Sequence, residues 1–89
     1  ATGRPAQALQ LYEEALPIMR EVGDRAGEAA TLSNLATLMQ QEGRGPAAVA
    51  RIKEAIALFR SGLTHDATGR TVEPYEELLA ELQAGETPQ

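Results

Sequence analysis

Cysteine is absent from the 89-residue chain, and tryptophan is absent with it. Without thiols the chain can form no disulfide framework, no thiolate zinc site and no cysteine nucleophile, so nothing in it requires an oxidising compartment. Aromatic residues make up only 3% of the sequence, while sixteen alanines and many leucines supply most of its apolar surface. This composition favours closely packed helices over a β-sandwich or barrel.

Positive charge and long apolar runs are also scarce. The chain has 8 basic and 13 acidic residues, for a net charge of −5. We therefore expect no sequence-independent binding to nucleic acid or to anionic lipid. No apolar run approaches the roughly 20 residues that cross a bilayer, and the first residues lack the apolar segment of a signal peptide. We expect a cytoplasmic protein or a piece of one, and the arginine and alanine content suggests a bacterial source.

Glycines and prolines divide the chain into four segments that each carry the apolar period of a helix. The segments predict one domain over residues 1–84, with helices at 5–22, 25–41, 46–61 and 73–83 and a frayed tail at 85–89. Asp24 is expected to cap the second helix, and Thr71 or Glu73 the last one. Pro17 is expected to kink the first helix rather than to end it, because the same apolar face continues on both sides.

The sequence also contains an internal repeat. A shift of 40 residues places Gly3-Arg4 on Gly43-Arg44, Ala8 on Ala48 and Glu14-Ala15 on Glu54-Ala55. A helix–turn–helix unit of about this period is typical of a solenoid. In a solenoid each hairpin is too thin to bury its own apolar face, so hairpins must stack on their neighbours.

These residues resemble the tetratricopeptide repeat family. Members of this family alternate large and small residues at fixed positions, and this sequence has a similar alternation. The matching residues are Leu32, Leu35-Ala36, Met39, Gly43, Ala48, Ile52 and Ala55. The period near 40 resembles the longer variety found in kinesin light chain. The resemblance implies an all-α fold of antiparallel hairpins stacked as a short α-solenoid. The chain would begin with the second helix of one repeat, continue with a full repeat and finish with a closing C-terminal helix.

No residue pattern predicts catalysis. His65 lies between Thr64 and Asp66, but adjacent residues cannot assemble a triad, whose members converge across a fold, and a helix-entry loop with capping roles is the better interpretation. In the pairs Glu13-Glu14 and Glu76-Glu77, neighbouring side chains point about 100° apart on a helix, which disfavours acid–base chemistry and metal binding. We predict a non-enzymatic protein with no catalytic, metal or cofactor site.

The resemblance implies protein–protein interaction, with helix 25–41 lining a concave face that holds an extended peptide. Asn34 stands where the longer-repeat relatives commonly place an asparagine that binds the peptide backbone, and its amide both donates and accepts. A solvated helix residue is the alternative. No lysine lies on this face, so the carboxylate clamp of some family members is expected to be absent, and the net charge favours basic peptides. The residues expected on this face include Ala30, Ser33, Asn34, Thr37 and Gln41.

Self-association is a second hypothesis. The first segment carries more large apolar residues than one neighbouring helix can cover, and such a patch normally marks an interface. It predicts a homodimer or larger assembly joined through residues 5–22. Both hypotheses fit a scaffold or adaptor segment of a larger protein whose partner the sequence does not identify. The patch comprises Leu9, Leu11, Leu16, Ile18 and Met19.

Overall fold

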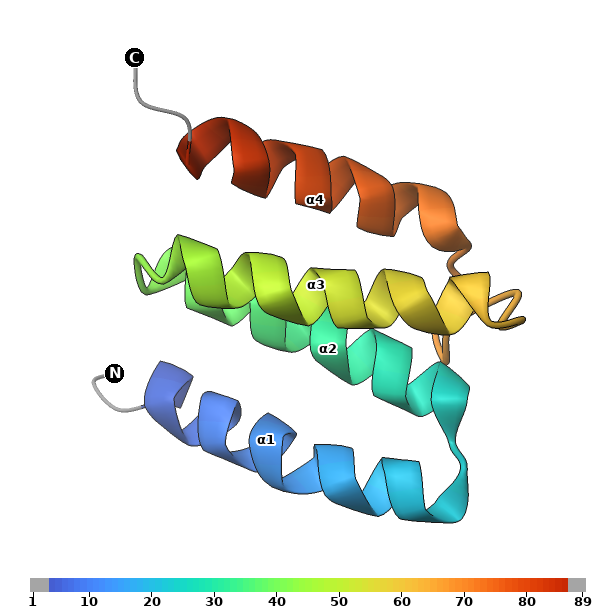
Figure 1. The fold of residues 1–89 in the computed structure, drawn as a ribbon. Coiled ribbons are helices and arrows are strands. Elements are labelled where there is room, and N and C mark those ends of the chain that lie inside the picture. The colour runs from blue at the N-terminus through green and yellow to red at the C-terminus, as the bar shows by residue number, and fades with distance from the viewer. Residues whose placement is uncertain (1–3, 87–89) are drawn as a thin grey trace.

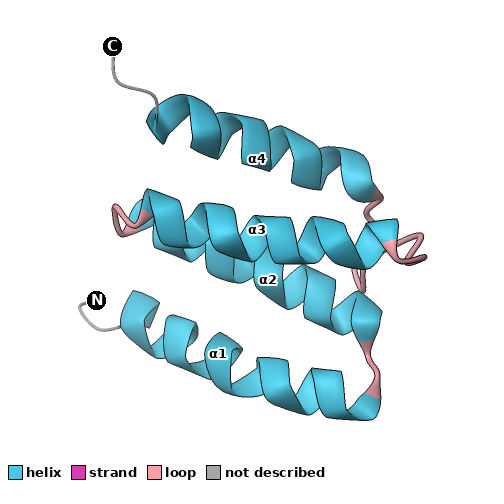
Figure 2. Ribbon diagram, viewed as in Figure 1, coloured by secondary structure: helices cyan, strands magenta, loops and turns pink. Residues whose placement is uncertain are grey.

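The computed structural model describes residues 4–86, and this part of the chain contains four helices and no strand (Figures 1 and 2). The prediction of an all-α fold is therefore confirmed. The helices are α1 (Arg4–Val22), α2 (Arg25–Gln41), α3 (Gly45–Arg60) and α4 (Val72–Glu86).

Two features of the terminal helices bear on the predictions. Helix α1 is continuous through Pro17, so this proline does not end the helix. Helix α4 extends beyond the predicted range of 73–83 at both ends. The predicted tail at 85–89 is wrong at its first two residues, because Gly85 lacks the left-handed φ that would end the helix. The rest of that tail lies outside the described residues.

Each of the first three helices ends in the same Schellman motif. At the end of α1, Gly23 has a φ of +78°, and the N–H of Asp24 donates to the carbonyl of Met19 at 2.8 Å. The N–H of Gly23 donates to the carbonyl of Arg20 at 3.3 Å. Glycine is favoured here because a Cβ would strain the left-handed backbone. The equivalent glycines after α2 and α3 are Gly43 and Gly62.

The start of α2 follows directly from the first of these motifs. Asp24 caps α2 as predicted, because its carboxylate accepts a hydrogen bond from the N–H of Gly27 at 2.9 Å. Only two residues separate α1 from α2, so the two helices must run antiparallel. Three residues join α2 to α3, so this pair is antiparallel as well.

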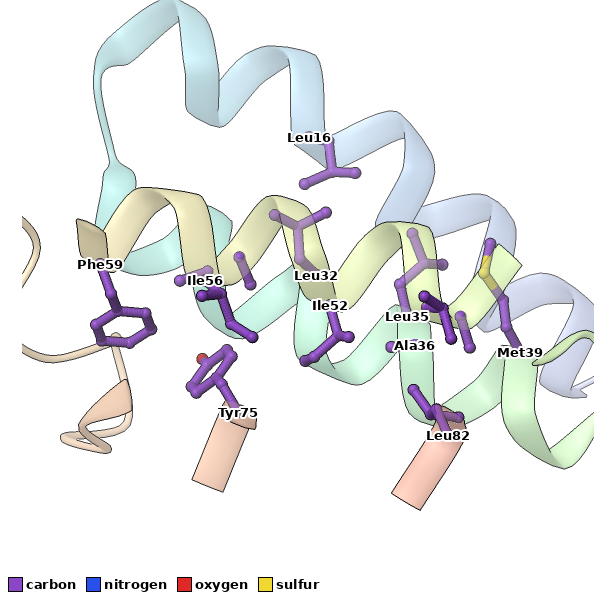
Figure 3. Close-up of a cluster of buried hydrophobic side chains, with 14 residues drawn as sticks. Leu16, Leu32, Leu35, Ala36, Met39, Ile52, Ile56, Phe59, Tyr75 and Leu82 are labelled. Atoms are coloured by element: carbon purple, nitrogen blue, oxygen red, sulfur yellow. The ribbon is translucent and has the colours of Figure 1, made fainter. Parts of the chain in front are cut away.

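The helices pack in chain order. Helix α2 lies between α1 and α3, and α4 packs against α3 (Figure 1). Their side chains form one continuous core, which Figure 3 shows with Leu16 of α1 and Tyr75 and Leu82 of α4 pointing into it. Ala36 and Ala48 are fully buried, so α2 and α3 can approach closely. The array is a short α-solenoid of stacked antiparallel helices.

Helix α4 is joined to α3 partly by an aromatic contact. The rings of Phe59 and Tyr75 lie edge to face, with centroids 4.8 Å apart and planes at 61°. Such pairs add about 0.5–1.5 kcal/mol beyond the burial of their area. Tyr75 is 1% exposed, so it anchors the first half of α4 in the core.

Candidate functional site

A groove of about 390 Å³ lies between α1 and α2. Because the two helices are antiparallel, the first half of α1 lies beside the second half of α2. Its lining combines small, apolar and uncharged polar side chains with a single charged one. The lining residues are Ala8, Tyr12, Ser33, Asn34, Thr37, Leu38 and Arg70.

Helix α2 supplies most of the polar groups in this groove. Thr37 lies four residues after Ser33 and three after Asn34, so it is a neighbour of both on the helix surface. The Thr37 hydroxyl donates to the carbonyl of Ser33 at 3.1 Å. Asn34 is exposed, and its amide makes no hydrogen bond to any other described residue. This amide is therefore available to an incoming ligand as both donor and acceptor.

The structure brings together three of the five residues that we predicted for a concave binding face. Ser33, Asn34 and Thr37 line the groove, whereas Ala30 and Gln41 do not. Ser33 is only 8% exposed, so little of its surface is accessible to a ligand in the groove. Binding by these residues stays a prediction.

Sequence analysis missed the other side of the groove. Ala8 and Tyr12 lie on α1, outside the binding face expected on helix 25–41, and both are half-buried. The aromatic ring of Tyr12 was the available signal. Arg70 had no signal, because it belongs to the connection between α3 and α4, whose path depends on tertiary contacts.

Hydrogen bonds fix the position of that connection. The N–H of Ala67 donates to the carbonyl of Ala26 in the first turn of α2, at 3.0 Å. Asp66 and Arg70 are bonded backbone to backbone at 2.8 Å, and the N–H of Arg70 also donates to the Asp66 carboxylate at 2.9 Å. The connection is thereby held against α2, and the backbone of Arg70 is held with it.

The buried carboxylate of Asp66 organises the whole turn. It accepts hydrogen bonds from the N–H and hydroxyl of Thr68, from the N–H of Arg70 and from the hydroxyl of Tyr75. Burial by itself raises the pKa of Asp66, but these hydrogen bonds outweigh it and lower the pKa to about 2. Burial, followed by the bond to Asp66, raises the pKa of Tyr75. At neutral pH an ionised Asp66 therefore faces a protonated Tyr75.

The structure corrects the capping role that we expected for residues 64–66. No helix begins after Asp66, because its carboxylate closes a turn that ends at Arg70. Helix α4 begins directly after Thr71. His65 is exposed in the connection, and its ring contacts the Thr64 hydroxyl at 3.3 Å.

Other chemistry is not assembled in the described part of the chain. Over residues 4–86, no three His, Asp or Glu side chains are grouped to hold a metal ion. None of the four helices combines the length and apolar character needed to cross a bilayer.

A network of ion pairs joins three helices away from the groove lining. Arg20 of α1 pairs with Glu28 of α2 at 2.8 Å and with Glu54 of α3 at 3.1 Å. Arg51 of α3 pairs with Glu54 at 2.9 Å and with Glu13 of α1 at 3.7 Å. These pairs engage two arginines with carboxylates, whereas Arg70 in the groove has no ion-pair partner among the described residues.

A second hollow, of about 540 Å³, lies between the α2–α3 turn and the end of α4. Three of its seven lining residues are glycines, so it offers few side chains that could orient a ligand. The groove between α1 and α2 is better equipped for recognition despite its smaller volume. The second hollow is lined by Gln40, Gly43, Gly45, Pro46, Glu81, Leu82 and Gly85.

The predicted self-association residues have different environments. The prediction that Leu16 is available to a partner is wrong, because this side chain is 3% exposed and lies in the core. Leu9 is half-buried against the same core. Ile18 is 62% exposed and shares one face of α1 with Leu11 and Val22, which are 65% and 71% exposed. The outer face of α1, defined by these last three residues, is thus apolar and uncovered.

Comparison with known proteins supports the repeat interpretation. A family model described as tetratricopeptide repeat matches residues 1–61, which span α1, α2 and α3. Neither the curated proteins nor the solved structures give a match.

Proposed function

This chain belongs to the tetratricopeptide repeat family, whose repeats mediate protein–protein interaction, and from this premise we propose that it binds an extended peptide of a partner protein in the groove between α1 and α2. The chain then acts as a non-enzymatic scaffold or adaptor segment. Stacked helical repeats offer extended concave surfaces for this purpose.

The availability of Asn34 carries the proposal. An extended peptide presents alternating N–H and C=O groups, and one carboxamide can bond to both kinds. Asn34 is exposed in the groove and unpaired within the described residues. Tyr12, on the opposite wall, adds an aromatic surface against which a peptide side chain can pack.

Titration calorimetry tests this function. A peptide selected by display on the wild-type chain is titrated into the wild type, Asn34→Ala and Gln7→Ala. Loss of a backbone hydrogen bond should weaken binding to Asn34→Ala by roughly 0.5–1.5 kcal/mol. Gln7 is an exposed amide on α1 outside the groove lining, so its variant should bind as the wild type does. Equal affinities for all three proteins would show that Asn34 does not bind the peptide and is a solvated helix residue.

Self-association is a second candidate, and the outer face of α1 favours it. The 40-residue repeat places Leu11 on Arg51 and Ile18 on Leu58. In α3, Arg51 pairs with Glu13 of α1 and Leu58 packs against the core, so this face of α3 meets a preceding helix. The same face of α1 meets no described helix. We propose that a second copy of the chain covers it.

Sedimentation velocity at micromolar concentration tests self-association. Leu11→Glu combined with Ile18→Glu should convert an assembly to monomers, because each change places a charge in the apolar contact. Ala57→Glu, on the exposed face of α3, is the control. Leu16→Glu is unsuitable, since it would place a charge in the core. A monomeric wild type would reject this candidate.

A further inference from the structure

Among the described residues that line the groove between α1 and α2, Arg70 is the one with a charged side chain. Within residues 4–86, no Asp or Glu lines the groove beside it. Its guanidinium makes no hydrogen bond or ion pair with any described residue. An arginine presents five N–H donors in a planar fork that matches a carboxylate. The charge of Arg70 acts on Tyr75, where it opposes the rise in the pKa of that hydroxyl, but no described carboxylate pairs with it. The groove therefore contains an anion-binding group without an ion-pair partner among the described residues, in a chain whose net charge is −5.

Asp66 belongs to the same turn as Arg70, but its carboxylate forms no ion pair with the Arg70 guanidinium. Asp66 is 5% exposed, and its carboxylate is engaged by Thr68, by Tyr75 and by the backbone N–H of Arg70. The same bonds hold the Arg70 backbone in place, together with the bond from Asp66 N–H to Arg70 C=O at 2.8 Å. Fixing the backbone before binding lowers the ordering cost that an incoming ligand must offset.

We propose that the groove selects an extended peptide bearing an aspartate or glutamate, whose side-chain carboxylate pairs with Arg70. This inference rests on the proposed peptide-binding function. Asn34 holds the backbone of a peptide that continues past it, so the group that reaches Arg70 is a side chain rather than the chain terminus. The cation is supplied by the α3–α4 connection, outside the helix face that sequence analysis considered.

This preference differs from the basic peptides that the net charge favours. Net charge acts over distance and is screened beyond about 8–10 Å at physiological salt. Recognition in the groove is decided at contact, where charge-assisted hydrogen bonds are roughly twice as strong as neutral ones. The acidic surroundings should slow the approach of an acidic peptide without removing its contact with Arg70.

Fluorescence polarisation with matched peptides tests the proposal. A peptide selected on the wild-type chain is compared with its Glu→Gln or Asp→Asn analogue, both C-terminally amidated. The wild type should prefer the acidic form by about twofold to fivefold, the size expected of an ion pair with an exposed arginine. Arg70→Gln should bind both forms equally, and Arg70→Lys should keep part of the preference. Arg60→Gln, an exposed arginine on α3 with the same loss of charge, should retain all of it.

The outcomes distinguish a failure of the Arg70 proposal from a failure of the proposed peptide-binding function. If no peptide binds the wild type, the proposed function fails and the inference fails with it. If peptides bind but show no acidic preference, or if the preference survives in Arg70→Gln, only the inference fails. In a second titration the acidic peptide is left with a free C-terminus. Binding that needs this free terminus and that is unchanged by the Glu→Gln or Asp→Asn replacement would overturn the assignment to a side chain. Circular dichroism confirms that each variant is helical before titration.

Discussion

Tyr75 donates a buried hydrogen bond to the carboxylate of Asp66. A buried carboxylate is costly unless hydrogen bonds replace its hydration, and four donors do so here. The donors come from the connection and from α4, while Ala67 in the same turn bonds to α2. One carboxylate thus helps to fix the path of the chain between α3 and α4.

Tyr75→Phe should lower the free energy of unfolding by about 1–3 kcal/mol, because it removes a donor from a buried carboxylate and leaves the ring packing intact. Tyr12→Phe is the matched control, since the Tyr12 hydroxyl has no partner among the described residues. Urea denaturation measures both variants. Equal midpoints for the two would show that the Asp66 contact does not contribute to stability.

Asp66 also predicts a dependence of stability on pH. Its folded pKa of about 2 lies below the ordinary value of 3.8. The stabilisation is therefore present above pH 4 and is lost as the pH falls toward 2. The two values correspond to about 2 kcal/mol. Denaturation at pH 5 and pH 2 should show a drop in the wild type that exceeds the drop in Asp66→Asn by about this amount, and equal drops would contradict it.

At the scale of the elements, the α2–α3 hairpin packs through small residues that are fully buried. Ala36 and Ala48 are fully buried where the helices meet. Ala48→Leu should overpack this contact and cost about 1–3 kcal/mol. Ala50→Leu, on the exposed side of the same helix, should change stability little. Chemical denaturation of both variants checks the repeat alignment, which an unchanged midpoint for Ala48→Leu would count against.

Local chemistry explains why the sequence predicted α2 well. The Asp24 cap and the glycines that end α1 and α2 act within a few residues, so their effect can be derived without the tertiary fold. Helix α4 also begins directly after Thr71, one of its two predicted caps. The path of the connection before α4 could not be derived in this way. It depends on Asp66, whose partner Tyr75 lies nine residues away, and on the contact of the connection with α2.

At the scale of the whole molecule, repeat position explains the different surfaces of α1 and α3. Leu16 and Ile56 are equivalent, and both are buried at 3% exposure. Tyr12 and Ile52 are also equivalent, yet Tyr12 is half-buried while Ile52 is fully buried. Helix α3 is covered by α2 and α4, whereas α1 packs mainly against α2. The sequence repeat alone could not predict this difference, because it depends on which neighbours are present.

The same reasoning applies to the groove. Its α2 side was predictable, because helical spacing and family resemblance place Asn34 and Thr37 on one face. The side of the groove formed by α1 and the α3–α4 connection was not predictable. Tyr12 became part of the groove because α1 is incompletely covered, and Arg70 because a connection crosses the first turn of α2.

Chemical-shift mapping tests the central claim, that a peptide binds between α1 and α2, most directly. A selected peptide is titrated into the ¹⁵N-labelled chain. We expect the largest shifts on the backbone amides of Tyr12, Ser33, Asn34, Thr37 and Arg70 and on the Asn34 side-chain amide. Shifts confined to the outer face of α1, or spread without preference over all four helices, would contradict it.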